Sequence, residues 1–396
     1  MRKICLTVVG LFISFFAAFS QTSQTDSAVY KNRKLKVDEI NLVASYYHQD
    51  GDHSPVTGGV GTQKLTNLAS SFEIKMVKYD RRLRKHTFDF ELGVDHYTSA
   101  SSDNIDPKTI SSASKSDTRY YPSLNWTVEN EQKGTTFGAG VGYSKEFDYT
   151  SYNANVSFAK KTRDRNGEFT IKGQVYLDEV KLVKPIELRT GASGDHYNSL
   201  ARNSYSGSLS YSQIINQRLQ IMFLLDMIYQ KGYLGLPFYR IYFDDNSEHI
   251  EHLPSTRFKL PIGFRANYFL GDKFIIRTFY RYYQDDWGLR AHTASIEVPV
   301  KITPFFSVTP FYRFYHQQAV DYFAPYLAHK TTEQYYTSNY DLSTFNSHFI
   351  GGGFRFAPPK GVFGSPHFNM LEVRYGHYMK NIDFNANIVS VNLRFK

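Results

Sequence analysis

The sequence has almost no cysteine and no long apolar run outside its N-terminus. Cys5 is the only cysteine among 396 residues, so a disulfide-stapled scaffold is excluded. After residue 20, no segment approaches the run of about 20 apolar residues that a membrane-spanning helix needs. A helical membrane protein is therefore excluded as well.

Aromatic side chains, in contrast, are abundant. The chain has 2 Trp, 31 Tyr and 32 Phe, which together make 16% of its residues. Such a chain has ample surface to bury or to place in lipid, which excludes intrinsic disorder. Lys and Arg number 46 against 37 Asp and Glu, for a formal charge of +9. The composition leaves two classes, a large soluble β protein and a transmembrane β-barrel.

The N-terminal residues 1–20 have the pattern of a secretory signal peptide. Arg2 and Lys3 form the basic region, residues 4–19 are apolar, and Ala18 and Ser20 flank Phe19 as a small-x-small cleavage site. A short membrane anchor is the alternative, but no stop-transfer charges follow. We predict a flexible periplasmic lead-in over residues 21–36 and one barrel domain over residues 37–396. An exported chain rarely meets nucleic acid, so the basic cluster at 31–36 predicts no such partner.

The rest of the chain repeats one unit, a stretch of strict alternation followed by a turn. Phe88, Phe90 and Leu92, for example, alternate with Asp89 and Glu91, and a period of two predicts a strand with one apolar and one polar face. Each of about sixteen units runs for about 9–11 residues, the length of a tilted strand that crosses a bilayer. They start near Val37, Leu68, Lys85, Thr118, Thr135, Tyr149, Gly167, Asn203, Gln217, Thr256, Lys273, Leu289, Phe305, His348, Asn369 and Asn385.

The lengths of the connections favour a membrane barrel over a soluble sandwich. With both termini in the periplasm, the even-numbered connections are short turns, apart from residues 358–368. The long connections all fall at the opposite end, although three short ones near Phe147, Trp287 and Met379 lie there too. The long ones are residues 49–67, 98–117, 179–202, 231–255 and 317–347. Outer-membrane barrels sort their connections in this way. The sequence therefore predicts an all-β, antiparallel transmembrane β-barrel of about 16 strands (14–16), with short periplasmic turns and long outer loops.

Aromatic residues at the strand ends fit the same architecture, because amphipathic rings favour the two bilayer interfaces. We expect interfacial girdles to include Tyr46, Tyr47, Tyr120, Tyr121, Tyr280, Tyr282, Tyr283, Tyr312 and Tyr315.

Charged residues in mid-strand are expected to face the lumen, since Arg or Lys on the lipid face at mid-bilayer costs about 2–4 kcal/mol. The third strand then contributes an acidic wall of Asp89, Glu91 and Asp95. Later strands contribute a basic wall of Arg265, Arg277, Arg281, Arg313, Arg355 and Arg374, with Glu297 and Glu372 among them. In a sixteen-strand barrel the third and eleventh strands are opposite, so the walls create a transverse field. The alternative is that these charges are solvated or pair with one another.

The segment 281–288 carries the densest local pattern of polar and aromatic residues. Asp285, Asp286 and Trp287 are outer-mouth candidates. One interpretation is a solute contact; the favoured one is a tight turn with Trp287 anchored at the membrane interface. The segment 321–326 opens a long loop that folds inward, covers the mouth or, most commonly for such loops, is simply exposed.

Signals for enzymatic chemistry are poor. No phosphate-binding loop, nucleophile elbow or His-Glu-x-x-His motif is present, and the Ser112/Lys115 spacing is attributed to chance. A lipid-cleaving Ser/His pair is disfavoured because His292 and Ser295 alternate onto opposite faces. The acidic segments 50–53 and 244–246 offer oxygen ligands without the spacing of a calcium loop. We predict no catalytic residues, no metal and no cofactor.

Three segments carry a resemblance to a known family. Residues 281–293 (RYYQDDWGLRAHT), 298–315 (VPVKITPFFSVTPFYRFY) and 321–326 (DYFAPY) resemble an uncharacterised family of Bacteroidota outer-membrane barrel proteins, domain-of-unknown-function family 3570. The similarity extends from about residue 37 to the end, including residues 97–102 and 232–237. The resemblance implies the outer membrane of a Gram-negative bacterium, and it brings no established activity or functional residues.

Three functional hypotheses follow. Sixteen strands leave an aqueous channel in porins, which favours a porin-like channel for small polar solutes, with outer-membrane lipid as the surroundings. Inward aromatic residues such as Tyr121, Tyr176 and Phe311 instead favour a plugged structural or accessory barrel that acts through its outer loops. An outer-membrane enzyme acting on lipid or glycan is the third and least favoured. The solute, the oligomeric state and any partner proteins are left open.

Overall fold

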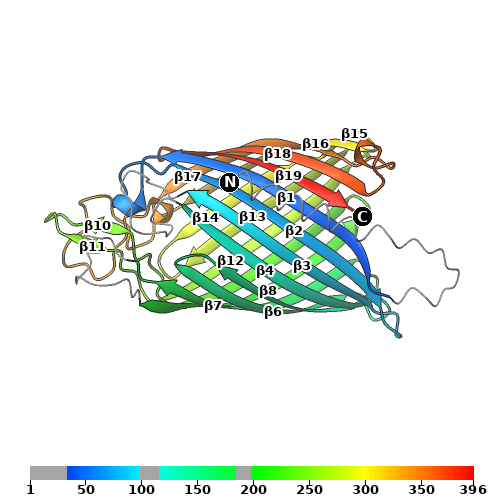
Figure 1. Ribbon diagram of the computed structural model, residues 1–396, viewed down its shortest axis with the longest axis horizontal. Coiled ribbons are helices and arrows are strands. Elements are labelled where there is room, and N and C mark those ends of the chain that lie inside the picture. Colours follow the sequence, from blue (N-terminus) through cyan, green and yellow to red (C-terminus); the bar gives the residue numbers. More distant parts are fainter. Residues whose placement is uncertain (1–33, 99–115, 184–197) are drawn as a thin grey trace, which may run out of the picture.

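The computed structural model describes residues 34–98, 116–183 and 198–396, which form a closed antiparallel β-barrel (Figure 1). The predicted leader and most of the lead-in lie outside the described residues. The first nine strands are β1 (Lys36–Gly51), β2 (Leu65–Tyr79), β3 (Lys85–Thr98), β4 (Ser116–Asn130), β5 (Thr135–Lys145), β6 (Tyr149–Lys161), β7 (Gly167–Lys181), β8 (Ser199–Asn216) and β9 (Leu219–Gly232). The remaining barrel strands are β12 (Thr256–Leu270), β13 (Phe274–Asp285), β14 (Arg290–Glu297), β15 (Val300–Thr303), β16 (Phe306–Gln317), β17 (Phe345–Phe356), β18 (Phe368–Lys380) and β19 (Phe384–Phe395).

The barrel wall has sixteen strand positions, here called staves, because β14 and β15 together occupy one of them. Both pair with β13 on one side and with β16 on the other, and the ladder is interrupted only at Val298 and Pro299. Proline lacks the N–H that a ladder position needs, which accounts for the break. Pairing of β1 with both β2 and β19 closes the ring. The predicted strand number is confirmed, and each predicted start lies within four residues of an observed one.

The strands are longer than predicted. β1 has 16 residues and β8 has 18, against the 9–11 that cross the apolar core of a bilayer. The periodicity marks the part of each strand with an apolar outer face, and the ladders continue beyond it into polar sequence. The prediction was therefore wrong about length, because hydrogen bonding does not stop where the apolar pattern stops.

The outer surface of the barrel is apolar around its circumference. Large side chains such as Leu68 (58% exposed), Val156, Phe223 and Ile350 (51% exposed) project from it. A soluble monomer rarely exposes apolar surface on this scale, whereas a membrane barrel carries an apolar band of this kind. The exterior thus matches the hydrocarbon core of a membrane.

Among the described residues, no helix has both the length and the apolar character needed to cross a membrane.

The two ends of the barrel differ in their connections. At one end, the short-turn end, strands are joined by short turns such as residues 80–84 and 271–273, and residues 357–367, with η5 (Val362–Gly364), are the longest link. The other end, the long-loop end, carries residues 52–64, 233–255 and 318–344. These loops contain η1 (Pro55–Thr57), the hairpin β10 (Arg240–Tyr242) with β11 (Glu248–Ile250), and η4 (Tyr340–Leu342). In Figure 1 they gather beyond the left-hand end of the barrel. The predicted sorting of loops is confirmed for the described connections, while most of the predicted long connections 98–117 and 179–202 lies outside the described residues.

The predicted tyrosine girdle is right for one half of its members and wrong for the other. Tyr46, Tyr120, Tyr280 and Tyr312 are exposed on the outer surface, and Tyr282 shares their face of the strand. The neighbouring Tyr47, Tyr121, Tyr283 and Tyr315 point into the barrel, because consecutive side chains on a strand point to opposite faces. Paired tyrosines at a strand end thus divide between lipid and lumen.

Glycine makes room for one of these inward rings. A Cβ atom at Gly93 would lie 1.9 Å from the Tyr121 ring, and the Tyr121 hydroxyl donates a 3.0 Å hydrogen bond to Asp95.

We expect Gly93→Ala to displace the Tyr121 ring and to destabilise the barrel by about 1–2 kcal/mol, measured by urea unfolding in detergent. Gly207→Ala is the matched control, since a Cβ there meets nothing within 4 Å. Equal unfolding midpoints for the two variants would contradict the packing argument, and a Tyr121→Ala background should abolish the cost.

Candidate functional site: the lumen and its mouth

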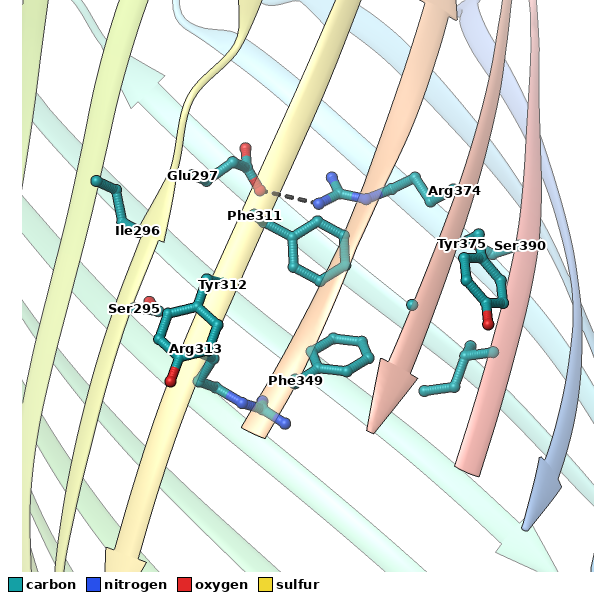
Figure 2. Close-up of a pocket in the computed structure, with 12 residues that line it drawn as sticks. Ser295, Ile296, Glu297, Phe311, Tyr312, Arg313, Phe349, Arg374, Tyr375 and Ser390 are labelled. Atoms are coloured by element: carbon teal, nitrogen blue, oxygen red, sulfur yellow. Dashed lines mark hydrogen bonds and ion pairs between the residues drawn. The ribbon is translucent and has the colours of Figure 1, made fainter. Parts of the chain in front are cut away.

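The predicted basic wall lies on five strands along one side of the barrel, from β12 to β18. Arg374 on β18 donates a 2.9 Å hydrogen bond to Glu297 on β14, although β16 and β17 lie between these strands. Two side chains three staves apart meet only on the concave face of a barrel. Figure 2 shows this ion pair and the residues around it. Arg374 and Glu297 therefore share the inner face of the barrel.

Part of the wall is neutralised by its own carboxylates. Glu297 also accepts from Arg277 at 2.8 Å, and Arg374 lies 3.6 Å from Glu372. In the described residues no carboxylate lies within ion-pair distance of the other four arginines, which are Arg265, Arg281, Arg313 and Arg355. The Arg355 guanidinium instead lies 3.0 Å from the Met370 sulfur. The wall thus combines two paired arginines with four that have no carboxylate partner.

Aromatic rings support three of these guanidinium groups. Arg265 lies over Phe279 at 5.7 Å, Arg313 over Phe349 at 5.0 Å and Arg374 over Phe311 at 5.2 Å, each measured to the ring centroid. The quadrupole of an aromatic ring attracts such a cation. Sequence analysis identified the arginines and Phe311, but not these pairings, since they join residues on different strands.

The Arg374–Glu297 pair and the two phenylalanines border a cavity of about 260 Å³. Phe311 and Phe349 are 5.0 Å apart and tilted toward each other. They lie against Gly351 and Gly376, where a Cβ atom would come within 2.6 Å of their rings. Glycine at these two positions keeps the rings close to the wall, and the cavity offers cationic, anionic and aromatic contacts at mid-barrel.

The predicted acidic wall is part of a larger acidic surface. Asp89, Glu91 and Asp95 occupy alternate positions of β3. Glu73 on β2 is directly opposite Glu91 in the strand register, and Asn41 donates hydrogen bonds to both Glu73 and Glu39. Sequence analysis missed Glu39 and Glu73, although Glu73 has the alternation of an inward residue. β3 is the third stave and β13 the eleventh, so β3 lies opposite β13 in the ring of sixteen, whereas β16 and β17 lie only six and five staves from β3.

The mouth candidates have structural roles in the long-loop end. Asp285 pairs with Arg257 at 2.5 Å and accepts hydrogen bonds from the backbone N–H groups of Trp287 and Leu289. Asp286 accepts from the Phe258 N–H. These contacts are turn chemistry, as the favoured interpretation predicted.

Trp287 is not an anchor at the membrane interface. It is 3% exposed and packs with Leu289, Ala291 and Val320, its indole N–H donates to the Thr256 carbonyl, and Arg257 lies 4.2 Å from its ring centroid. That part of the prediction was wrong, because the sequence does not show that a loop covers this turn.

The loops of the long-loop end pack together over the mouth. We call residues 52–64, 233–255 and 318–344 the mouth cap. Short bridges join Phe243 to His329 and His252 to Tyr336, and the His53 ring stacks on Tyr340 at 3.8 Å. The segment 321–326 belongs to this cap, so it is not simply exposed as is most common for such loops.

Inward side chains of the barrel anchor the cap. Tyr283 and Tyr315 contact the apolar cluster around Trp287, together with Tyr322, Phe323 and Leu342 of the cap. The cap therefore rests on lumen-facing rings as well as on the rim.

A buried carboxylate joins two of the cap's loops. Glu251 is 4% exposed and accepts hydrogen bonds from Thr337 Oγ1 at 2.5 Å and from the Leu236 N–H at 2.8 Å. Burial raises the pKa of the Glu251 carboxyl to about 7, against the opposing effect of these two hydrogen bonds and of Arg202. The fully buried His329 lies within hydrogen-bond distance of Glu333 and of the carbonyl of the same Thr337.

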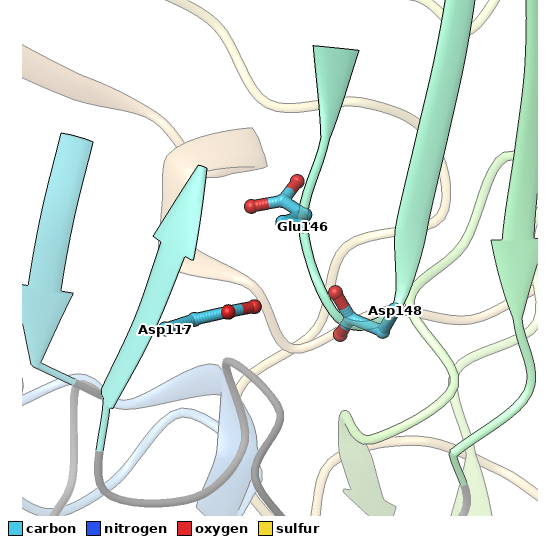
Figure 3. A group of neighbouring side chains, drawn as sticks. All are labelled: Asp117, Glu146 and Asp148. Carbon is cyan, nitrogen blue, oxygen red and sulfur yellow. The ribbon is translucent and has the colours of Figure 1, made fainter. Parts of the chain in front are cut away.

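A group of three carboxylates lies at the long-loop ends of β4 and β6. One oxygen each of Asp117, Glu146 and Asp148 fall within 4.8 Å of one another (Figure 3). The Tyr97 hydroxyl donates to Glu146, and Asp117 accepts from the Thr118 and Phe147 N–H groups. Burial raises the pKa of Glu146. Sequence analysis missed this group, which joins Asp117 of β4 to Glu146 and Asp148 of the turn between β5 and β6.

His292 and Ser295 occupy opposite faces of β14, as predicted. His292 is exposed, whereas Ser295 has the alternation of the buried Ala291 and Thr293. The two side chains do not meet.

Comparison with known proteins identifies the family. The sequence profile of a family described as "Protein of unknown function (DUF3570)" matches residues 8–381. The chain belongs to this family. No curated protein sequence matches it.

Several solved structures match the chain at low sequence identity. OccK9 (OpdG) of Pseudomonas aeruginosa has a TM-score of 0.44 and 9% identity over 92% of this chain and 99% of its own. A BenF-like porin from Pseudomonas fluorescens Pf-5 has a TM-score of 0.42 and 8% identity over 90% and 98%. CdiB from Acinetobacter baumannii has a TM-score of 0.45 and 9% identity over 90% and 60%.

The raised pKa of Glu251 predicts a pH-dependent mouth cap. The carboxyl keeps its proton up to about pH 7 in the folded cap but only to about 4.5 when the cap is open, so the closed cap binds more protons between these values. Its stability is therefore full below about pH 4.5 and falls, on the order of 1–3 kcal/mol, as the pH rises through about 7. Trp287 fluorescence in a Trp126→Phe background should report this loosening.

Two variants test the assignment to Glu251. Glu251→Gln should flatten the pH profile, because the amide has no proton to lose. Asp245→Asn removes an exposed carboxyl of the same loop and should leave the profile as it is. If the Glu251→Gln profile matched that of the parent, another group would control the cap.

Proposed function

We propose that the protein is a porin-like channel of the outer membrane for small polar solutes. The observation that carries the proposal is the closed ring of sixteen staves with an apolar exterior and a charged interior. Barrels of sixteen strands leave an aqueous channel. The sorted connections support both termini in the periplasm and the long-loop end outside. The signal-like N-terminus supports export in a Gram-negative bacterium, with outer-membrane lipid around the barrel.

The opposed charges of the lumen support weak selectivity. Among the described residues, four arginines without a carboxylate partner lie five to eight staves from the acidic strand β3, so a field crosses the pathway. Charged residues lining a pore restrict passage by charge. Since Arg277 and Arg374 are paired with Glu297, we assign the field to the remaining arginines.

The mouth cap favours a second candidate, a plugged structural or accessory barrel that acts through its outer loops. Its support is the packing of cap residues onto the inward rings of Tyr283 and Tyr315. Such a barrel conducts only when the cap is displaced.

Planar-bilayer recordings separate the two candidates. A porin-like channel should give stepwise conductance once the folded barrel is inserted, and loosening the cap with Val320→Asp should raise it. A barrel with a confirmed fold and no conductance, which opens only after Val320→Asp, would favour the plugged form. No conductance from either protein would count against both a channel and a removable plug.

Reversal potentials in a salt gradient test the selectivity. Replacement of Arg265, Arg281 and Arg313 together by Gln should shift selectivity toward cations, because three lumen charges are lost. The control replaces Lys145, Lys231 and Arg290 by Gln, three exposed cations on the outer surface. It removes the same amount of charge from the outer surface of the barrel and should cause no shift in ion selectivity. An equal shift in both proteins would show that net charge, rather than the wall, sets selectivity.

A further inference from the structure

Six histidines form a belt on the outer surface of one half of the barrel. They have the strand alternation of the exposed apolar residues: His292 is exposed between the buried Ala291 and Thr293, and His96 alternates with the inward Asp95 and Tyr97. The histidine belt comprises His48, His96, His292, His316, His348 and His377.

The belt lies at one depth. Each member is within four residues of the long-loop end of its strand, and the exposed Tyr46, Tyr280, Tyr312 and Tyr375 lie beside it. Tyrosine on the outside of a barrel marks the level of the lipid headgroups. The imidazoles are therefore placed at the headgroup level of the outer leaflet.

Strand pairing makes the belt continuous. His292 is directly opposite His316 across the β14–β16 ladder. His48 on β1 is opposite Asn387 on β19, which is also opposite His377 on β18. The belt thus runs from β14 through the closure of the barrel to His96 on β3.

Each imidazole of the belt lies within hydrogen-bond distance of a neighbouring side chain through its Nδ1 atom. Nδ1 of His292 and His348 is 2.8 Å from the hydroxyls of Tyr280 and Tyr312. The other four make equivalent contacts at 2.7–3.1 Å with Asn346, Asn387, Thr66 and Thr118. In the described part of the chain, Nε2 of each ring has no hydrogen-bond partner. The rings are fixed in orientation, and each presents a second nitrogen to a ligand.

The charged residues around the belt are of both signs. Arg290 lies two residues before His292 on the same exposed face. Asp50 is the carboxylate on an outward strand position of the belt, and Lys64 lies 3.9 Å from it; the nearby turns add Asp286 and Asp383. The other half of the barrel presents Lys145 and Lys231 at this level but no histidine among the described outward strand positions.

We propose that the histidine belt binds the phosphate groups of phosphorylated lipids in the outer leaflet. Imidazole gains a positive charge between about pH 8 and pH 5, and a protonated ring donates a charge-assisted hydrogen bond to a phosphate oxygen. Neighbouring tyrosines supply an apolar face for the acyl chains. The belt gives the barrel one side that prefers phosphorylated lipid, and this assignment does not depend on conduction through the lumen.

Native mass spectrometry of the full-length barrel in neutral detergent tests the proposal. The probe is a glucosamine-disaccharide lipid with two phosphates, and the comparison probe is the same lipid after enzymatic removal of both. The belt variant carries His292→Gln, His316→Gln and His348→Gln. Loss of three imidazoles, each with a free nitrogen, should weaken the apparent Kd for the phosphorylated lipid about tenfold.

Two controls make the result specific. Lys145→Gln with Lys231→Gln removes two outward cations of the opposite half and should leave the Kd unchanged. Conductance and heat-modifiable migration on gels should be those of the parent in both variants, which shows that the barrel is folded.

Three outcomes would overturn the proposal. One is equal binding of the phosphorylated and dephosphorylated lipids. Another is an unchanged Kd in the belt variant. The third is a dimer that dissociates when the three histidines are replaced, since the belt would then be a subunit interface.

Discussion

Ring closure is the constraint on which the rest of the molecule depends. In a bilayer no water is present to satisfy backbone N–H and C=O groups, so every strand needs a hydrogen-bonded neighbour on both sides. The β1–β19 ladder, from Ile40 opposite Phe395 to Gly51 opposite Phe384, supplies the last pair. Once the ring is closed, each side chain faces either lipid or lumen. The placement of Arg313 inside and His348 outside follows from that one choice.

The periodicity of the sequence predicts the barrel because alternation is a local property that survives in any barrel of this kind. The number of staves, their starts and the sorting of the loops all depend on it. The mouth cap could not be predicted, since Glu251 meets Thr337 at a separation of 86 positions and both residues lie in loops that carry no period. Trp287 was misplaced for the same reason: a strand-end tryptophan covered by a loop has the same sequence as one exposed to lipid.

The charged walls show the same division between local and distant information. The alternation along each strand alone places the arginines and Asp89 on the inner face, because a charged side chain on the lipid face is unfavourable. The Arg374–Glu297 pair depends on curvature, which brings staves β14 and β18 together on the concave face only. The position of Glu73 opposite Glu91 depends on the register between β2 and β3. Both properties arise from the assembled sheet, so a single strand does not reveal them.

The mouth cap and the histidine belt place titratable groups at the same end of the barrel for different physical reasons. Glu251 is kept from water, and burial of an ionised carboxylate is unfavourable; its proton therefore stabilises contacts within the chain. The belt imidazoles keep one nitrogen free at the surface, where it is available to an external ligand. Acidification thus tightens the cap, whereas the belt acts on molecules outside the chain. The geometry of the barrel, with one face enclosed and one face open, is sufficient to produce both roles.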